Sequence, residues 1–216
     1  RRVTPRTKVV ILCSPHNPAG TSVGSAEFGR FLAALGGDPP LLVLDEAYRD
    51  FADDPECVDG IPLLREHPTL IVLRTFSKIA GLAGLRVGYA VAGPEIVSML
   101  NRARAPYNVN RLAQVAALAA LEDRLHWERT RRLVILERRF LTGELRRLGL
   151  SVVPSQANFI LVHVGARAAA LREALLKEGI LVRDGGAVGF PGHLRITLGT
   201  RETNARLVRV VERLAP

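Results

Sequence analysis

The sequence predicts an α/β protein with a mostly parallel sheet, helices on both faces of that sheet, and a smaller C-terminal α/β domain. Short apolar runs alternate with helix-like stretches along the first half of the chain, which is typical of parallel strands joined by helices. A second, smaller series of such runs follows one long helical stretch. The chain has 216 residues, of which 48% are hydrophobic and 24% are charged. This composition supplies a sizeable core and argues against disorder.

The strands of the first domain are predicted by four apolar runs bounded by polar, Pro or Gly residues, at 8–12, 41–44, 70–74 and 87–92. Two prolines and a glycine predict a fixed turn directly after the first of these runs. Apolar residues with helical spacing then predict a helix that Gly36 ends. The polar segment that precedes the third strand, with its Pro and Gly residues, predicts mostly loop.

Helices dominate the middle of the chain. Pro94 suits the first turn of a helix that reaches about residue 104. Further helices are predicted at 111–122 and about 124–148, and we place the domain boundary near the start of the long one, giving domains 1–122 and 123–216. Beyond it we expect strands at 151–153, 158–162, 180–183 and 194–198, and helices at 166–178 and 201–214, the last with Thr200 as its N-cap.

Charge and cysteine content narrow the functional classes. The net charge of +9 comes mostly from arginines spread along helix-like stretches with glutamates among them. No aromatic-rich RNA motif accompanies them, so solvated helix faces are favoured over nucleic-acid binding. The two cysteines form no disulfide framework, which indicates a reducing, cytoplasmic setting. No apolar run is long enough to span a membrane, and the histidines lack metal-binding spacing, so we expect no membrane and no metal partner.

Polar side chains follow three of the predicted strands. Asn17 comes after the first strand, Asp45 after the second, and Ser77-Lys78 after the third. Ligands of open α/β sheets bind beyond the carboxyl ends of the strands, so these groups are expected to share one edge. An amine, a carboxylate and a group of hydroxyls with an arginine fit pyridoxal phosphate, because lysine forms a Schiff base with its aldehyde and a carboxylate keeps its ring nitrogen protonated.

Longer motifs surround these residues and continue through the chain. They are Ser14-Pro15-His16-Asn17-Pro18-Ala19-Gly20, Leu44-Asp45-Glu46-Ala47-Tyr48, Arg74-Thr75-Phe76-Ser77-Lys78, Gly81-Leu82-Ala83-Gly84-Leu85-Arg86-Val87-Gly88-Tyr89, Pro106-Tyr107-Asn108, Ser155-Gln156-Ala157-Asn158-Phe159 and Leu194-Arg195-Ile196-Thr197-Leu198-Gly199-Thr200. With these motifs the chain resembles the fold-type-I pyridoxal-phosphate aminotransferases. Within them it is most similar to the histidinol-phosphate aminotransferases and their aromatic-aminotransferase relatives.

The resemblance implies a cofactor site. Lys78 would carry pyridoxal 5'-phosphate as a Schiff base and, once released, move a proton as the catalytic residue. Asp45 would pair with the pyridine nitrogen. Asn17 and Tyr48 would contact the 3-oxygen of the ring. Thr75, Ser77 and Arg86 would bind the phosphate.

The resemblance also implies substrate-binding residues. Arg195 would take the substrate α-carboxylate as a bidentate fork. Asn158, Tyr107 and Asn108 would lie near the substrate. Alternatives stay open for two of these residues, because Arg195 alternates with apolar neighbours and could face water on an edge strand, and Asn158 could cap a strand.

The implied activity is transfer of an amino group between histidinol phosphate or an aromatic amino acid and 2-oxoglutarate, in a homodimer. A related pyridoxal-phosphate-dependent threonine-phosphate decarboxylase and a truncated, non-catalytic fragment are the alternatives. Members of the family carry a long segment before the strand that comes first here, and that segment contributes to the grip on the cofactor phosphate. Without those preceding strands, we expect one sheet edge and part of the core to be exposed.

Overall fold

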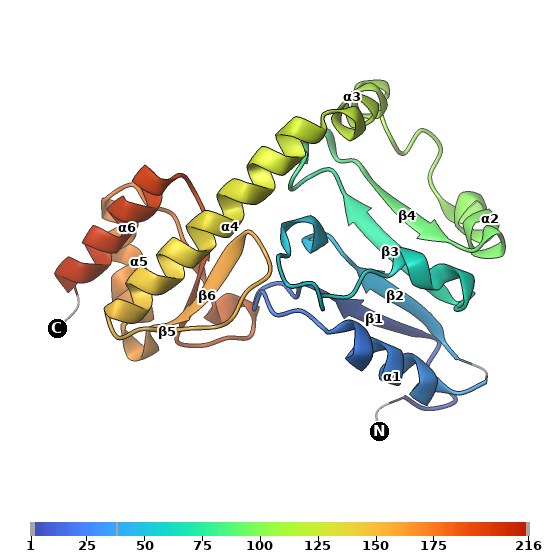
Figure 1. Cartoon of the computed structure of the whole chain (residues 1–216), viewed down its shortest axis with the longest axis horizontal. Helices are drawn as coiled ribbons and strands as arrows, with labels where there is room; N and C mark the ends of the chain where they lie inside the picture. Colours follow the sequence, from blue (N-terminus) through green and yellow to red (C-terminus); the bar gives the residue numbers. More distant parts are fainter. Residues whose placement is uncertain (1–2, 38, 215–216) are drawn as a thin grey trace.

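The computed structural model describes residues 3–37 and 39–214 and contains two sheets, with the long helix α4 (Arg124–Arg147) running from one toward the other (Figure 1). The first sheet has the order β1-β2-β3-β4, and the second has the order β5-β6-β8-β7. The predicted division at residues 122 and 123 stays a prediction, although α3 ends at Glu122 and α4 begins at Arg124.

The first sheet is mostly parallel, as predicted. β1 (Val9–Cys13), β2 (Leu41–Asp45) and β3 (Leu70–Thr75) run parallel, and β4 (Gly88–Ala92) returns antiparallel to β3. The carboxyl ends of β1, β2 and β3 therefore lie at one edge of the sheet. The segment between β2 and β3, predicted as mostly loop, contains two short 3-10 helices, η1 (Arg49–Phe51) and η2 (Ile61–Arg65).

One face of this sheet is covered by α1 (Ser25–Leu35), which ends at Gly36 with φ of 82°, as its sequence predicts. The side chains buried beneath α1 form one core cluster of Phe28, Leu42, Leu44, Val58, Leu70 and Val72. α2 (Pro94–Ala103) and α3 (Arg111–Glu122) follow β4 in the chain. Ala113 and Ala117 of α3 pack against Phe76 and Val87, which flank the ends of β3 and β4.

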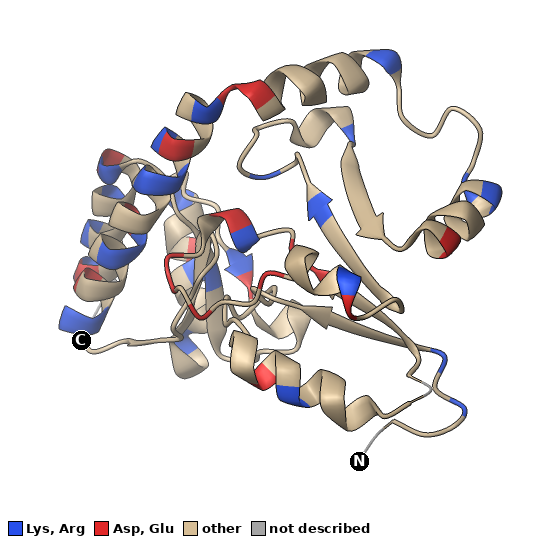
Figure 2. Cartoon of the chain, turned by 45° about the vertical axis from the view of Figure 1, so that its right-hand side comes forward, with Lys and Arg blue, Asp and Glu red and all other residues tan. Residues whose placement is uncertain are grey.

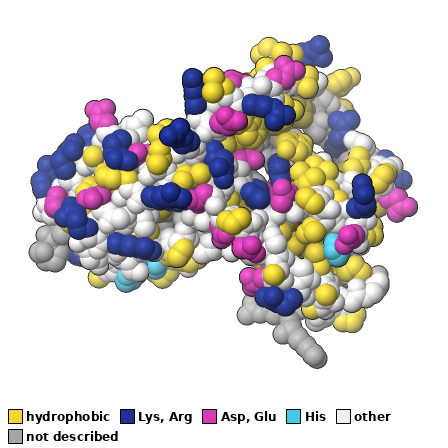
Figure 3. Space-filling model, in the orientation of Figure 1, with side chains coloured by type: hydrophobic (Ala, Val, Ile, Leu, Met, Phe, Trp, Pro, Cys, Tyr) yellow, Lys and Arg dark blue, Asp and Glu magenta, His cyan; other side chains and the backbone are white. Residues whose placement is uncertain are grey.

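The opposite face of β1 is open. Val9 is 47% exposed and Ile11 is 69% exposed, because they alternate with Val10 and Leu12, which pack toward α1. Figure 3 shows hydrophobic side chains gathered on the part of the molecule that carries α3, β3 and β4. The expected exposure of a sheet edge and of apolar side chains is confirmed for the described residues.

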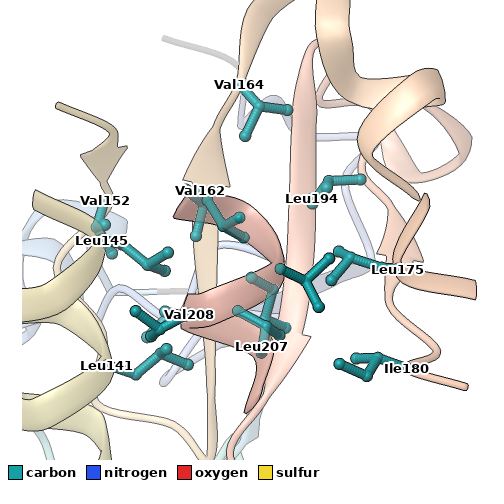
Figure 4. Close-up of a cluster of buried hydrophobic side chains, with 14 residues drawn as sticks. Leu141, Leu145, Val152, Val162, Val164, Leu175, Ile180, Leu194, Leu207 and Val208 are labelled. Carbon is teal, nitrogen blue, oxygen red and sulfur yellow. The ribbon is translucent and has the colours of Figure 1, made fainter. Parts of the chain in front are cut away.

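The second sheet is antiparallel throughout its described strands, β5 (Ser151–Val152), β6 (Phe159–His163), β7 (Arg183–Asp184) and β8 (His193–Thr197). Helices α4, α5 (Ala168–Lys177) and α6 (Arg201–Leu214) bury one face of it. Figure 4 shows Val162 and Leu194 of the sheet pointing toward Leu141, Leu175 and Leu207 of these helices. Thr200 caps α6, since its Oγ1 accepts a hydrogen bond from the Thr203 N–H.

The predicted strand at 180–183 is wrong in its bounds. Residue Ile180 donates its N–H to the carbonyl of Leu175, and the Gly179 N–H is bonded to Leu176, so these residues complete the end of α5. Only Arg183 and Asp184 pair with β8. Two short 3-10 helices, η4 (Gly165–Arg167) and η5 (Gly186–Val188), fill further connections of this domain.

The uncovered face of the second sheet packs against the first domain. Phe159 of β6 joins a buried cluster with Tyr48, Phe51 and Ile79 of the first domain and Val134 of α4. Basic residues are spread along α4 and α6 with acidic residues among them (Figure 2). Over residues 3–37 and 39–214, no helix has the length and apolar character needed to cross a membrane.

Candidate active site

The site is built at the carboxyl edge of the first sheet. Cys13 at the end of β1 pairs with Asp45 at the end of β2, and Asp45 in turn pairs with Leu73 of β3. Asn17 lies in the turn after β1, and Lys78 lies three residues after the end of β3. The predicted grouping of these side chains at one edge follows directly from the parallel register.

A continuous series of side-chain contacts joins this edge to the second sheet. Lys78 Nζ lies 5.2 Å from the centroid of the Tyr48 ring, and Tyr48 makes an edge-to-face contact with Phe159 at 5.1 Å between centroids. The Arg195 guanidinium lies 4.9 Å from the Phe159 ring centroid. Arg195 Nη1 then donates to Asn17 Oδ1 at 2.7 Å, across 178 positions of sequence. The fold thus joins an amine, a phenol, a guanidinium and an amide in one series of contacts.

Arg195 faces the first domain. It pairs with Leu161 in the β6–β8 ladder, while its neighbours Leu194 and Ile196 point into the core of the second domain. Within the described residues its Nε is buried and has no hydrogen-bond partner. A buried donor without a partner costs free energy, and a ligand carboxylate or phosphate could accept from it. β8 is an inner strand of its sheet and not an edge strand, and Arg195 is half-buried, so its substrate-binding role stays a prediction.

Asp45 is held by its own loop. Its Oδ1 accepts the N–H of Ala47 at 3.0 Å, and the side chain is half-buried. Its strand neighbour Cys13 donates its thiol to the carbonyl of Pro15 at 3.3 Å. Burial, reinforced by the Asp45 charge and opposed by a hydrogen bond from the Asn17 backbone, raises the pKa of the Cys13 thiol, so this neighbour is uncharged at neutral pH.

The three predicted phosphate-binding residues lie where β3 and β4 diverge. Thr75 pairs with Gly88, and the Phe76 N–H donates to the Val87 carbonyl, so Ser77 and Arg86 are the residues that follow and precede this last contact between the two segments. The Ser77 N–H donates to Thr75 Oγ1 at 3.0 Å. Arg86 has a left-handed backbone with φ of 56°, and its Nη1 donates to the carbonyl of Ala83. The backbone thus groups the three residues, while the Arg86 side chain is exposed.

Three other predicted residues are not joined to this group by a contact among the described residues. Asn158 directly precedes Phe159, and its carbonyl accepts from the Leu198 N–H. Tyr107 is 98% exposed in the connection between α2 and α3. Asn108 accepts a hydrogen bond there from Arg104. Their substrate-binding roles stay predictions.

Two residues of the site were not singled out by sequence reasoning. Phe159 links Tyr48 to Arg195, and Gln156 binds the loop after Tyr48, since its Oε1 accepts the N–H groups of Asp53 and Asp54. Gln156 also donates its backbone N–H to the carbonyl of Gly20. Both residues belong to the motif Ser155–Phe159, and the inward-facing position of Phe159 beside Arg195 in the sheet is a signal that could have found it.

The fold and the edge of polar groups define an α/β protein of the pyridoxal-phosphate-transferase type. The family described as aminotransferase class I and II matches residues 1–211, and the chain belongs to that family. The predicted family and fold class are therefore confirmed.

The chain is similar to histidinol-phosphate aminotransferases. It is 48% identical over 210 residues to the one from Anaeromyxobacter sp. (strain Fw109-5), covering 97% of this chain and 57% of that protein. It is 46% identical over 207 residues to the one from Symbiobacterium thermophilum, covering 95% of this chain and 56% of that protein. The chain therefore spans little more than half the length of these curated relatives.

Solved structures show the same similarity. The histidinol-phosphate aminotransferase from Sinorhizobium meliloti, in complex with pyridoxal-5'-phosphate, matches with a TM-score of 0.87 and 29% identity, covering 96% of this chain and 57% of that one. The L-threonine-O-3-phosphate decarboxylase from Porphyromonas gingivalis matches with a TM-score of 0.82 and 28% identity, covering 96% of this chain and 64% of that one.

Proposed function

We propose that the chain carries a large part of the active site of a pyridoxal-phosphate-dependent aminotransferase that moves an amino group between histidinol phosphate and 2-oxoglutarate. The observation that carries this proposal is the contact series from Lys78 to Asn17, because it brings an amine and an anion-binding guanidinium to the same sheet edge as Asp45. The relatives at 48% and 46% identity support the choice of histidinol phosphate.

The residues fit the cofactor chemically. Bound pyridoxal phosphate supplies an electron sink for reactions at an amino-acid carbon. Lys78, with its exposed amine, would hold the cofactor aldehyde and later move a proton at Nζ. Asp45, already held by the Ala47 N–H, would keep the ring nitrogen protonated. Thr75, Ser77 and Arg86, near the divergence of β3 and β4, would supply donors for the phosphate.

Arg195 is suited to both proposed substrates. Its guanidinium forms bidentate pairs with carboxylates and with phosphates, so it could bind 2-oxoglutarate and histidinol phosphate in turn. The Phe159 ring and the hydrogen bond to Asn17 hold the guanidinium, and its Nε has no hydrogen-bond partner among the described residues, so it is available to a ligand. An aromatic amino acid is a second candidate donor, because Tyr48 and Phe159 give the site an aromatic wall.

We also propose that the functional protein is a cytoplasmic homodimer. Exposed leucines on α3, among them Leu112 and Leu118, form an apolar surface that a second copy could cover. The two free thiols, Cys13 and Cys57, are compatible with a reducing compartment.

The test of the cofactor proposal uses the small number of lysines. The chain has only Lys8, Lys78 and Lys177. After incubation with pyridoxal phosphate and borohydride reduction, peptide mass analysis should find the cofactor on the peptide with Lys78. Lys78→Ala should remove this label, whereas the control Lys177→Ala should keep it. An equal label on all three lysines, or no label, would contradict the proposal.

The substrate proposal is tested separately on protein that carries the label. Histidinol phosphate, phenylalanine and O-phosphothreonine are offered with 2-oxoglutarate, and glutamate and carbon dioxide are measured. We expect glutamate from histidinol phosphate. Glutamate from phenylalanine alone would favour the aromatic donor, and carbon dioxide from O-phosphothreonine would favour a decarboxylase.

A further inference from the structure

A buried ion pair lies beside the site and has no part in the chemistry proposed above. The Glu46 side chain is fully buried, and its Oε2 accepts from Arg74 Nε at 2.9 Å. Its Oε1 accepts the N–H of Gly60 at 2.6 Å. Arg74 Nη2 also donates to Asp59 Oδ1 at 2.9 Å. Every charged group of this cluster therefore has a partner of opposite charge.

The pair is placed directly behind the site residues. Glu46 follows Asp45, and Arg74 precedes Thr75, so by strand alternation the pair points to the face of the sheet opposite Asp45 and Thr75. The Glu46 N–H also donates to the Leu73 carbonyl at 2.9 Å. The cluster thus ties the carboxyl end of β2 to the carboxyl end of β3 from behind.

The surroundings of the pair are close-packed. A Cβ on Gly60 would lie 2.7 Å from Val72 Cγ2 and 2.8 Å from Leu44 Cδ2, so only glycine allows the backbone to approach Glu46 this closely. Burial raises the pKa of Glu46, against hydrogen bonds from Gly60 and Arg74 that lower it. Buried ion pairs contribute little net stability compared with apolar residues of the same size, and their best-attested use is to specify one arrangement.

We propose that Glu46 and Arg74 are positioning residues that set the relative placement of Asp45 on β2 and the Thr75–Lys78 segment after β3. In the protein, the distance between the carboxylate for the ring nitrogen and the lysine for the aldehyde then depends on this ion pair. This inference deepens the proposed function and rests on it for the identity of the ligand, but the positioning itself is a property of the chain alone.

Hydrogen exchange at two backbone amides reports the placement of Asp45 and of the Thr75–Lys78 segment without any cofactor. The Ala47 N–H is bonded to Asp45 Oδ1, and the Ser77 N–H is bonded to Thr75 Oγ1, both at 3.0 Å. In Glu46→Gln, which keeps the shape but removes the charge, hydrogen exchange measured by NMR should accelerate about tenfold at both amides, equivalent to about 1.4 kcal/mol of local opening. Exchange in the middle of β2 and β3, for example at Val43 and Val72, should accelerate less.

The matched control is Glu137→Gln. Glu137 is also buried, is paired with Arg201 at 2.9 Å, and accepts from Asn204, but it joins α4 to α6 in the second domain. This control should leave Ala47 and Ser77 unchanged. If both variants accelerate these two amides equally, or if Glu46→Gln accelerates all amides of the sheet to the same degree, the pair only contributes stability and the proposal is overturned.

A milder variant covers the case in which Glu46→Gln does not fold. Asp59 is 41% exposed and accepts from Arg74 and from the Ile61 N–H. Asp59→Asn keeps an acceptor for Ile61 and removes one negative partner of Arg74, so it should accelerate the same two amides about two- to threefold. No acceleration at either amide in Asp59→Asn, together with an unfolded Glu46→Gln, would assign the pair to stability alone and overturn the proposal.

Labelling with pyridoxal phosphate and borohydride separates this proposal from the proposed function. Glu46→Gln should need about tenfold more cofactor than the wild type for half-maximal label on Lys78. If the wild type takes no label while the amides respond as expected, the proposed function fails and the positioning stands. If Lys78 is labelled equally in both proteins and the amides do not respond, the positioning is wrong and the proposed function stands.

Discussion

The ring of Phe159 lies between two side chains that the site depends on. One side contacts the Tyr48 ring, and the Arg195 guanidinium lies 4.9 Å from its centroid. The ring is 2% exposed, so both contacts are made away from water, where aromatic and cation–π contacts are stronger. This single side chain therefore couples Arg195, the proposed anion-binding residue of the second sheet, to Tyr48 after β2.

Phe159→Leu should lower the free energy of unfolding by about 1–2 kcal/mol, because the substitution removes both ring contacts while keeping an apolar side chain. It should also weaken 2-oxoglutarate binding severalfold, since Arg195 loses the surface that orients it. Urea unfolding and calorimetry measure the two effects.

Phe140→Leu is the matched control for this prediction. The Phe140 ring centroid lies 3.9 Å from the guanidinium carbon of Arg201, so this pair repeats the cation–π geometry outside the contact series from Lys78 to Asn17. The control should affect stability but not 2-oxoglutarate binding. Equal weakening of binding in both variants would show that Phe159 does not orient Arg195.

At the same scale, the shared sheet edge of the residues that follow the strands could be predicted from the sequence. Asn17, Asp45 and Lys78 were predicted because strand ends of a parallel sheet meet at one edge. Phe159 and the Glu46–Arg74 pair were not predicted, because their roles depend on what packs against them from other elements. The Glu46–Arg74 pair could have been predicted, because Asp45 pairs with Leu73 and the residues that follow them, Glu46 and Arg74, therefore lie side by side.

Helix α4 is anchored to the loop that follows Tyr48. Arg138 and Arg139 of α4 both bond the carboxylate of Asp53, and Arg131 donates to the carbonyl of Ala52. Gln156 holds the same loop, since its Oε1 accepts the backbone N–H groups of Asp53 and Asp54. The Asp53 carboxylate thus binds two guanidinium groups where α4, the loop after Tyr48 and the segment of Gln156 meet.

Asp53 should make this anchor pH-dependent. Burial alone would raise the pKa of its carboxyl, but the hydrogen bond from Arg139 and the charge of Arg138 outweigh burial and hold the pKa below its ordinary value. A carboxyl with a lowered folded-state pKa stabilises the fold above its unfolded pKa of about 3.9, and that contribution is lost as the pH falls through the lower folded value.

Asp53→Asn should therefore be less stable than the wild type at neutral pH, and the difference should shrink as the pH falls below about 4. The measurement is the urea midpoint of both proteins across this range. Parallel curves for the two proteins would show that the Asp53 charge does not contribute to the anchor.

The bounds of helices and strands could be predicted where the local periodicity is strong. They were less accurate where hydrogen bonds from other residues set the end of an element. The helix predicted at 111–122 has those bounds, because its N-cap Asn110 accepts the Ala113 N–H and its apolar spacing is regular. The strand predicted at 180–183 is wrong in its bounds, because the N–H groups of Gly179 and Ile180 donate to carbonyls at the end of α5. The antiparallel order of the second sheet also depends on pairing that no single run of sequence contains.

At the scale of the whole molecule, the two sheets share one buried junction. Arg138 is 5% exposed and donates to the carbonyls of Phe51 and Ala157 at 3.2 and 2.9 Å, besides its bond to Asp53. These acceptors lie in the loop after β2 and in the turn just before β6, so one guanidinium connects that loop to the segment that leads into the strand of Phe159. The placement of Arg195 over the carboxyl edge of the first sheet depends on this junction.

Arg138→Met should lower the free energy of unfolding by about 3–5 kcal/mol, because it leaves a carboxylate and two carbonyls of the junction without their buried partner. Arg139→Met removes a bond to the same carboxylate from a side chain that is 70% exposed, and should cost less than about 1 kcal/mol.

Urea unfolding followed by circular dichroism compares the stability of the two variants. The fluorescence of Trp127, the chain's one tryptophan, reports the unfolding of α4. If Arg138 joins the domains, the two signals should coincide in the wild type and in Arg139→Met and separate in Arg138→Met. Equal losses in both variants would place the connection between the sheets in the apolar cluster around Phe159 instead.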